Sequence, residues 1–329
     1  MSFLNSFNSK RYFANPGNFE SLALDLFHYQ SKHNKIYANY LTALNVNTNK
    51  IKSVYSIPFL PISFFKSHEV ITDSWSPTRI FESSGTSDIT TSKHLIQDQY
   101  MYLTNTLTIF KSNYGEPENY HILSLLPSYL ERNNSSLVMM VDSLIKSSKS
   151  EYSGFYLDEF DKLADTLKLA CNSNRKVMLI GVSFGLLDFI EKYQFKMPEL
   201  IVIETGGMKG RRKELIRLEL HQLLKNGFGV KNIHSEYGMT ELLSQAYSFK
   251  DGQFESPPWM KILIRDVNDP FTYLNTKRSG GINVIDLANT HSCAFIETQD
   301  VGFISDDNTF EVLGRFDNSD IRGCNLLIG

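Results

Sequence analysis

Residues 177–182 read Val-Met-Leu-Ile-Gly-Val, and residues 200–203 read Leu-Ile-Val-Ile. Both runs have the length and apolar composition of parallel strands that are buried on two faces. Three further segments have the apolar spacing of helices, and Gly227 is the expected C-cap of the last: 94–111, 157–170 and 209–226. Strand and helix therefore alternate through the middle of the chain. This alternation predicts an α/β layered sheet, with ligand sites in the loops beyond the carboxyl ends of its strands.

The two ends of the chain have different patterns. Aromatic and aliphatic residues in the first 70 positions suggest helices. After residue 257 the sequence changes to short strand-like segments separated by turns, 261–265, 281–286 and 294–297. We therefore expect three regions: a helical segment packed on the core (1–70), an α/β core (71–255) and a β-rich subdomain (256–329).

Composition excludes several classes of protein. The 329 residues include 33 basic and 36 acidic side chains, so no basic field is available and we expect no nucleic-acid partner. The chain has neither a run of about 18 apolar residues nor a leader-like start, which predicts no membrane insertion and a cytoplasmic location. Its three cysteines are far apart, and its eight histidines lack metal-ligand spacing. A disulfide framework and a protein-bound transition metal are therefore not expected.

The first candidate site is residues 82–87, Glu-Ser-Ser-Gly-Thr-Ser, directly after the apolar pair Ile80 and Phe81. Backbone N–H groups and hydroxyls in such a loop can hold phosphate oxygens, and Gly85 allows close approach. The GxxxxGK[ST] pattern of kinases and GTPases is absent. The alternative for this segment alone is a solvated Ser/Thr turn.

Two further segments combine glycine with polar or aromatic side chains. Residues 235–241 read Ser-Glu-Tyr-Gly-Met-Thr-Glu, which can stack a ring on a purine, touch phosphate and hold Mg²⁺. Residues 204–210 read Glu-Thr-Gly-Gly-Met-Lys-Gly and follow a strand, so a planar base could lie against the paired glycines. Either segment alone also fits an ordinary turn before a helix.

The fourth candidate combines Asp300, in Thr-Gln-Asp-Val-Gly, with Arg315, in Gly-Arg-Phe-Asp. A carboxylate can accept hydrogen bonds from both ribose hydroxyls, and an arginine can reach hydroxyl or phosphate oxygens. Each residue alone also fits a turn with an ion pair. The four motifs become specific only together and in this order.

The ordered motifs resemble the acyl-adenylating superfamily, which contains acyl-CoA synthetases, firefly-type luciferases and adenylation domains of peptide synthetases. The resemblance covers roughly residues 55–329. Four segments within it are similar to the long-chain fatty acid protein ligases, the acyl-protein synthetase subunits of the bacterial bioluminescence fatty acid reductase: 125–130, 206–212, 286–289 and 319–324. The implied fold is a layered α/β adenylate-forming domain, with helices around largely parallel sheets, followed by a β-rich C-terminal subdomain.

The resemblance also implies a role for each motif in a ligase that uses ATP and Mg²⁺. Contacts to the β- and γ-phosphates are implied for Ser83, Ser84, Gly85, Thr86 and Ser87. Contacts around the adenine are implied for Gly206, Gly207, Tyr237 and Gly238. The remaining roles are ribose for Asp300, ribose or phosphate for Arg315, Mg²⁺ for Glu241 and the vicinity of the α-phosphate for Thr240.

The sequence departs from the family pattern in two places. The superfamily loop usually continues Gly-Lys-Pro-Lys, whereas residues 88–93 are Asp-Ile-Thr-Thr-Ser-Lys, so Lys93 is the candidate for the loop lysine. Larger ligases also carry a mobile C-terminal domain whose lysine assists adenylation. Because this chain stops 14 residues after Arg315, we expect that domain to be missing. Another basic residue or a partner protein would then complete the site.

The expected reaction is activation of a fatty acid as an acyl-adenylate, followed by transfer to a thiol. In the resembled ligases the thiol is a cysteine of the enzyme, which passes the acyl group to a reductase, and Cys324 is the matching candidate. Cys171 and Cys293 are expected to pack as small hydrophobes. Two alternatives stay open: a compact acyl- or aryl-CoA ligase related to phenylacetate-CoA ligases, and a non-catalytic acyl- or nucleotide-binding subunit.

Overall fold

A computed structural model describes residues 3–12, 14–83, 91–126, 134–206 and 215–316. Most strands belong to one mixed sheet: β1 (Leu60–Pro61), β4 (Tyr120–Leu125), β5 (Gly154–Phe155), β6 (Lys176–Val182), β7 (Ile201–Thr205), β8 (His234–Tyr237), β9 (Ala246–Ser248), β10 (Phe254–Glu255), β11 (Met260–Arg265), β12 (Gly280–Asp286), β13 (Phe295–Ile304) and β14 (Phe310–Arg315). Their order is β11-β12-β13-β14-β10-β9-β8-β7-β6-β4-β5, and β1 pairs with β13. The fold is therefore α/β, as predicted.

The strands β5, β4, β6, β7 and β8 run parallel to one another. The apolar run 177–182 lies in β6, where every residue after Lys176 is buried. Burial on both faces explains why this strand is continuously apolar instead of alternating. The predicted alternation of strand and helix is confirmed, and the carboxyl ends of β7 and β8 lie at the same edge of the sheet.

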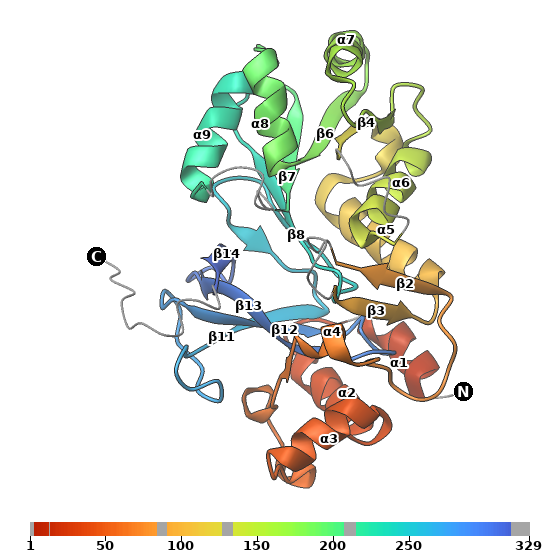
Figure 1. Cartoon of the computed structure of the whole chain (residues 1–329), viewed down its shortest axis with the longest axis vertical. Coiled ribbons are helices and arrows are strands. Elements are labelled where there is room, and N and C mark those ends of the chain that lie inside the picture. The colour runs from red at the N-terminus through yellow and green to blue at the C-terminus, as the bar shows by residue number, and fades with distance from the viewer. Residues whose placement is uncertain (1–2, 13, 84–90, 127–133, 207–214, 317–329) are drawn as a thin grey trace.

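Helices cover both faces of these parallel strands. Figure 1 shows α8 (Ser183–Lys192) and α9 (Arg217–Phe228) on one side, with α5 (Gln99–Tyr114) and α6 (Ser136–Ser148) on the other. The ring of Phe160, at the start of α7 (Phe160–Cys171), lies 5.5 Å from that of Phe189 in α8. Among the described residues, no helix is both long and apolar enough to cross a membrane.

The carboxyl-terminal part of the described chain is β-rich, as predicted, and its antiparallel strands continue the same sheet. Strands β12 and β13 are longer than the predicted segments. Of the alternative for Arg315, a turn with an ion pair, the ion pair with Asp300 is present, but Arg315 lies in β14 opposite Asp300 of β13 and not in a turn. Pairing with a distant strand, which local sequence does not reveal, makes this segment extended.

The amino-terminal helices pack beside these carboxyl-terminal strands (Figure 1), as α1 (Phe3–Arg11), α2 (Phe19–His33), α3 (Lys35–Ala43) and the short α4 (Phe64–Ser67). Gln30 of α2 is fully buried. Its Nε2 lies 2.8 Å from the Asn289 carbonyl oxygen, and its Oε1 accepts from the Ala294 N–H at 3.0 Å. One amide side chain thus joins the first and last thirds of the chain.

The predicted helix 94–111 is wrong at its start. Residues 94–96 belong to β3 (Lys93–Ile96), which pairs with β2 (Arg79–Glu82) as an antiparallel hairpin. Helix α5 begins after Asp98, whose carboxylate accepts from the Tyr100 N–H at 2.8 Å and caps the helix. The residues between β2 and β3 include the predicted phosphate loop.

The boundaries of α7 and α9 also differ from the predictions. Leu157 has φ +45°, so α7 starts later than the predicted residue 157. Of the predicted segment 209–226, residues 209–214 lie outside the described residues, and the described helix begins at Arg217. Gly227 lies inside α9, so its assignment as the C-cap is wrong. The cap is Gly229, with φ +68° and its N–H bonded to the Lys225 carbonyl.

Replacement of Gln30 by leucine should destabilise the protein by about 2–4 kcal/mol, because it leaves buried carbonyl groups and the Ala294 N–H without partners. The measurement is the free energy of unfolding from urea titration. Gln222→Leu, at an exposed glutamine of α9, is the matched control and should change stability by less than about 0.5 kcal/mol. Equal effects of the two variants would contradict the structural role of Gln30.

Candidate active site

Asp300 and Arg315, which are 15 residues apart in sequence, are direct partners across β13 and β14. The Arg315 Nε donates to Asp300 Oδ1 at 2.8 Å. The Tyr237 hydroxyl, at the end of β8, donates to Asp300 Oδ2 at 2.9 Å. Asp300 is only 5% exposed, whereas the Arg315 side chain is 66% exposed. A fixed carboxylate therefore lies beside a cation that can move.

The ring of Tyr237 is held by two phenylalanines. Its centroid lies 5.4 Å from that of Phe310, edge to face, and 5.8 Å from that of Phe254. Burial, and then the neighbouring Asp300 carboxylate, raise the pKa of Tyr237 well above its usual range. The hydroxyl therefore stays protonated and acts as a hydrogen-bond donor to Asp300.

Glu241 is buried close to this pair. Burial raises the pKa of its carboxyl group, while a hydrogen bond with the Ser92 side chain and the charge of Arg315 act in the opposite direction. Asp300 is also near enough to influence this pKa. The structure thus brings together Tyr237, Glu241, Asp300 and Arg315, which come from two of the four sequence motifs.

Ser92 also closes the base of the predicted phosphate loop. The Ser83 N–H donates to the Ser92 carbonyl at 3.0 Å, and the Ser92 N–H donates to the Ser83 hydroxyl at 2.9 Å. The other predicted loop residues lie outside the described residues: Ser84, Gly85, Thr86 and Ser87. The two described ends of the loop therefore start next to Glu241.

Lys93 is not brought to this group. It is exposed and lies on β3 between Ser92, which contacts Glu241, and His94, which contacts the Thr240 backbone. Because successive side chains of a strand point to opposite faces, Lys93 points away from both contacts. Among the described residues, the cation that lies beside Asp300 and Glu241 is Arg315 instead.

His94 fixes the backbone beside Glu241. Its Nδ1 lies 2.9 Å from the Thr240 carbonyl oxygen, and its Nε2 lies 2.9 Å from the Ser292 hydroxyl. Burial lowers the pKa of His94 to about 4, so the ring is neutral at neutral pH. A carbonyl oxygen can only accept, which requires the proton on Nδ1 and makes Nε2 the acceptor from Ser292. In addition, Asn289 Nδ2 donates to the Glu241 carbonyl at 2.9 Å.

Asp286 fixes the segment that follows Glu241. Its Oδ2 accepts from the N–H groups of Leu243 and Ser244, each at 2.9 Å. Its Oδ1 accepts from the Ser244 hydroxyl at 2.7 Å and from the Ala288 N–H at 3.0 Å. Burial nevertheless raises the pKa of Asp286, which is fully buried. Residues 286–289 were identified in the sequence only through the family resemblance. The role of His94 was not predicted, because nothing in its local sequence indicates it.

The predicted site glycines that the structure describes, Gly206 and Gly238, have different surroundings. A Cβ at Gly238 would lie 2.4 Å from Glu236 Oε1, so a larger residue there would have to displace the Glu236 carboxylate. Gly206 follows β7 with φ +66°, and its carbonyl oxygen accepts from the Ser183 hydroxyl at 2.9 Å. Gly207 and the candidate nucleophile Cys324 lie outside the described residues.

The donor set at the site fits a metal bound together with a nucleotide. Within the described parts of the chain, no group of three or more His, Cys, Asp or Glu side chains could hold a metal ion. Mg²⁺ with ATP commonly uses one or two protein carboxylates together with water and phosphate oxygens. The buried Glu241 carboxylate beside the loop base suits this mode and does not suit a metal cage built from protein alone.

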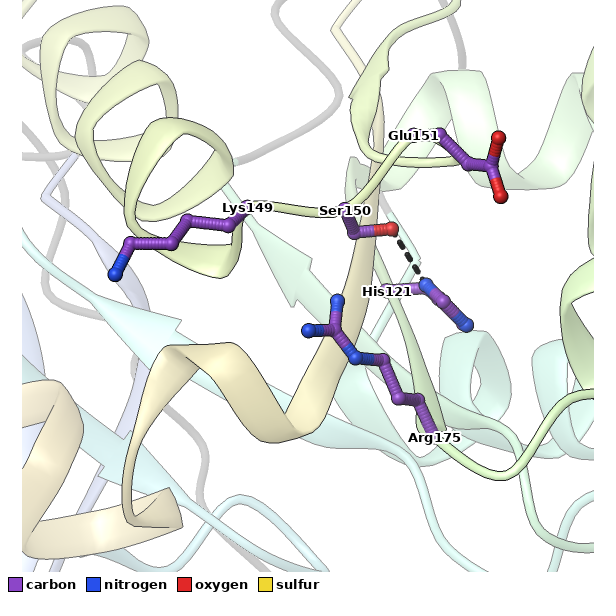
Figure 2. Close-up of a pocket in the computed structure, with 5 residues that line it drawn as sticks. All are labelled: His121, Lys149, Ser150, Glu151 and Arg175. Atoms are coloured by element: carbon purple, nitrogen blue, oxygen red, sulfur yellow. Dashed lines mark hydrogen bonds between the residues drawn. The ribbon is translucent and has the colours of Figure 1, made fainter.

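A separate cavity of about 380 Å³ lies at the amino ends of β4 and β6, opposite to the ends that carry the site, and is lined by His121, Lys149, Ser150, Glu151 and Arg175 (Figure 2). His121 bonds the Ser150 hydroxyl at 2.5 Å and that of Ser173 at 2.7 Å. Lys149 pairs with Glu118 at 3.3 Å. Because it lies at the opposite end of the strands, the cavity does not belong to the candidate active site.

Comparison with solved structures supports the fold. ATP-bound MatB from Rhodopseudomonas palustris matches at a TM-score of 0.56 and 16% identity, over 74% of this chain and 49% of that one. A 2-hydroxyisobutyryl-CoA ligase with 2-HIB-AMP and CoA in the thioesterification state matches at 0.71 and 11%, over 94% and 71%. The chain thus spans about half the length of the first of these. These are adenylate-forming ligase folds.

No match is found among curated proteins. The model of the family described as acyl-protein synthetase, LuxE, matches residues 16–329, which is nearly the whole sequence. This match agrees with the motif order and with the convergence of Tyr237, Glu241, Asp300 and Arg315 in the fold. The chain therefore belongs to the LuxE acyl-protein synthetase family.

Proposed function

We propose that this protein activates a fatty acid with ATP as an acyl-adenylate and then accepts the acyl group on Cys324 as a thioester. A reductase or another partner protein would receive the acyl group. Membership of the acyl-protein synthetase family supports the ligase activity. The observation that carries the proposal is the cluster of Asp300, Arg315, Tyr237 and Glu241 at the base of the serine-rich loop.

The first step is an in-line displacement at the α-phosphorus of ATP. A bond forms between a carboxylate oxygen of the acid and phosphorus, while the bond to the bridging oxygen breaks and pyrophosphate leaves with the electron pair. Arg315 can face the phosphate oxygens because its side chain is exposed. Asp300 can accept from ribose hydroxyls as Arg315 moves aside. Bound Mg²⁺, held by Glu241, would neutralise charge on the phosphates.

The loop from Thr240 to Ser244 is held by hydrogen bonds from buried side chains, and this supports the proposed chemistry. Its carbonyl and N–H groups are already bonded to His94, Asn289 and Asp286. A nucleotide would therefore meet groups whose positions are set before it binds, so little free energy is spent on ordering them. Most of the catalytic effect we assign to these residues is positioning.

The second step needs a thiolate that attacks the carbonyl carbon and releases AMP. Cys293 is fully buried, as expected, and burial raises its pKa to about 12, so it is not a nucleophile at neutral pH. The expectation that Cys171 packs as a small hydrophobe is wrong, because it is exposed. However, Cys171 is the last residue of α7 and lies near the amino end of β6, whereas the site lies at the carboxyl ends of the strands. These findings support Cys324 as the acyl carrier.

Glu241→Ala should abolish exchange of labelled pyrophosphate into ATP in the presence of Mg²⁺ and fatty acid, since it removes the carboxylate assigned to the metal. The assay uses the full chain with saturated acids of medium and long chain. Glu255→Ala, at an exposed carboxylate of β10, is the control and should keep wild-type exchange. Wild-type protein that binds ATP but exchanges pyrophosphate with none of these acids, even with its partner present, would disprove the proposed function.

Asp300→Ala should lower kcat/KM for ATP by roughly 100-fold or more. Hydrogen bonds to a charged group contribute about 1.5–3 kcal/mol each, and 1.36 kcal/mol corresponds to a factor of ten. Asp307→Ala is the matched control: this exposed aspartate accepts from the Thr309 N–H in the turn before β14. Wild-type ATP kinetics in Asp300→Ala would show that Asp300 has only a structural role in β13.

Incubation with ATP and labelled fatty acid should place a label on the protein that neutral hydroxylamine removes. Cys324→Ser should lose this label and keep pyrophosphate exchange, because adenylation needs no thiol whereas acyl transfer does. Cys171→Ser and Cys293→Ala are controls that should keep the label. A label that persists in Cys324→Ser would rule out Cys324. Acyl-CoA formation without any labelled protein would identify a CoA ligase.

A further inference from the structure

A largely buried network of charged and polar side chains is hydrogen-bonded to the Gly206 carbonyl. Its members are Glu204, Arg217, His221 and Ser183. Glu204, near the end of β7, has a side chain that is only 6% exposed. Its Oε1 lies 3.1 Å from Arg217 Nη1 and 3.4 Å from His221 Nε2, both from α9. The Ser183 hydroxyl, at the start of α8, donates to its Oε2 at 3.2 Å. One carboxylate thus connects β7 to α8 and α9, which pack on this face of the sheet.

Ser183 connects this network to the turn after β7. Its hydroxyl lies within hydrogen-bond distance of both Glu204 Oε2 (3.2 Å) and the Gly206 carbonyl oxygen (2.9 Å). A hydroxyl has one proton to donate, so the two acceptors share or exchange it. The direction of the Gly206 carbonyl, on a residue with φ +66°, therefore depends on Ser183 and Glu204 together.

Stability alone does not explain a charged network at this place. Removing charges from water costs about as much as a buried ion pair returns, and apolar residues of similar volume often serve as well. What the network does supply is a defined geometry. It fixes the start of α8, the first turns of α9 and the carbonyl of Gly206 relative to one another.

The network also extends toward Asp300. The Arg217 guanidinium carbon lies 4.9 Å from the centre of the Phe254 ring. Phe254 contacts Tyr237 at a centroid distance of 5.8 Å, and the Tyr237 hydroxyl donates to Asp300. Gly206, expected to contact the adenine, and Asp300, expected to contact the ribose, are therefore connected through packed side chains.

We propose that Ser183 and Glu204 are positioning residues for the nucleotide: they hold the Gly206 turn in the orientation that ATP binds. This inference rests on the proposed function. Neither residue touches the reacting atoms, so their loss should weaken ATP binding and leave the chemical step nearly unchanged.

The test replaces Ser183 with alanine, which removes the donor and adds no bulk. In pyrophosphate exchange, KM for ATP should rise on the order of tenfold, while kcat changes by less than about twofold and KM for the acid stays constant. Titration calorimetry of the full chain with ATP and Mg²⁺, without acid, should show the same loss of affinity. Ser183→Thr keeps the hydroxyl and should retain near wild-type affinity.

Ser148→Ala is the matched control. Ser148 is also fully buried and donates to the Ile145 carbonyl at 2.7 Å, but it lies at the end of α6, away from the site. Its replacement should lower the melting temperature without changing ATP affinity. Wild-type ATP affinity in Ser183→Ala, or an equal loss in Ser148→Ala, would overturn the inference. Absence of exchange in the wild type would instead refute the proposed function, while calorimetry would still test Ser183.

Discussion

The burial of Asp286 is the constraint on which the candidate site depends. A carboxylate removed from water must find donors, and Asp286 finds four in the backbone and side chain of residues 243, 244 and 288. These bonds determine the path of the chain directly after Glu241. His94 and Asn289 hold the backbone of Thr240 and Glu241 from other elements. The path of the loop is thus set by its hydrogen bonds to buried polar groups.

The residues of the candidate site differ in their exposure to solvent. Tyr237, Glu241 and Asp300 are buried and held by neighbouring side chains, whereas Arg315 is largely exposed. A ligand that displaces Arg315 must supply its own donors to Asp300, because this carboxylate is buried and would otherwise lose its cation. The arrangement suits a substrate that brings both hydroxyl donors and negative charge, such as a nucleoside triphosphate.

Buried carboxylates are concentrated at this part of the fold. Among the described residues, the buried acidic side chains are Glu204, Glu241, Asp286 and Asp300. Burial raises the pKa of Glu241 and of Asp286, so each charged form is held at an energetic cost. Buried ionisable groups of this kind are concentrated at functional sites. The apolar core and the long sheet supply the stability that offsets their energetic cost.

The sequence by itself determined the fold class and the order of the site motifs. Continuous apolar runs such as 177–182 indicate parallel strands because burial on two faces leaves no alternating pattern. Glycines and polar residues at strand ends marked Gly206, Tyr237, Glu241, Asp300 and Arg315. Only the tertiary structure decided that β3 precedes α5, that Gly229 caps α9, and that His94, Asp286 and Ser183 support the site. The cross-fold partners of His94, Asp286 and Ser183 lie 21 to 198 residues away, and these hydrogen bonds exist only once those segments have packed together.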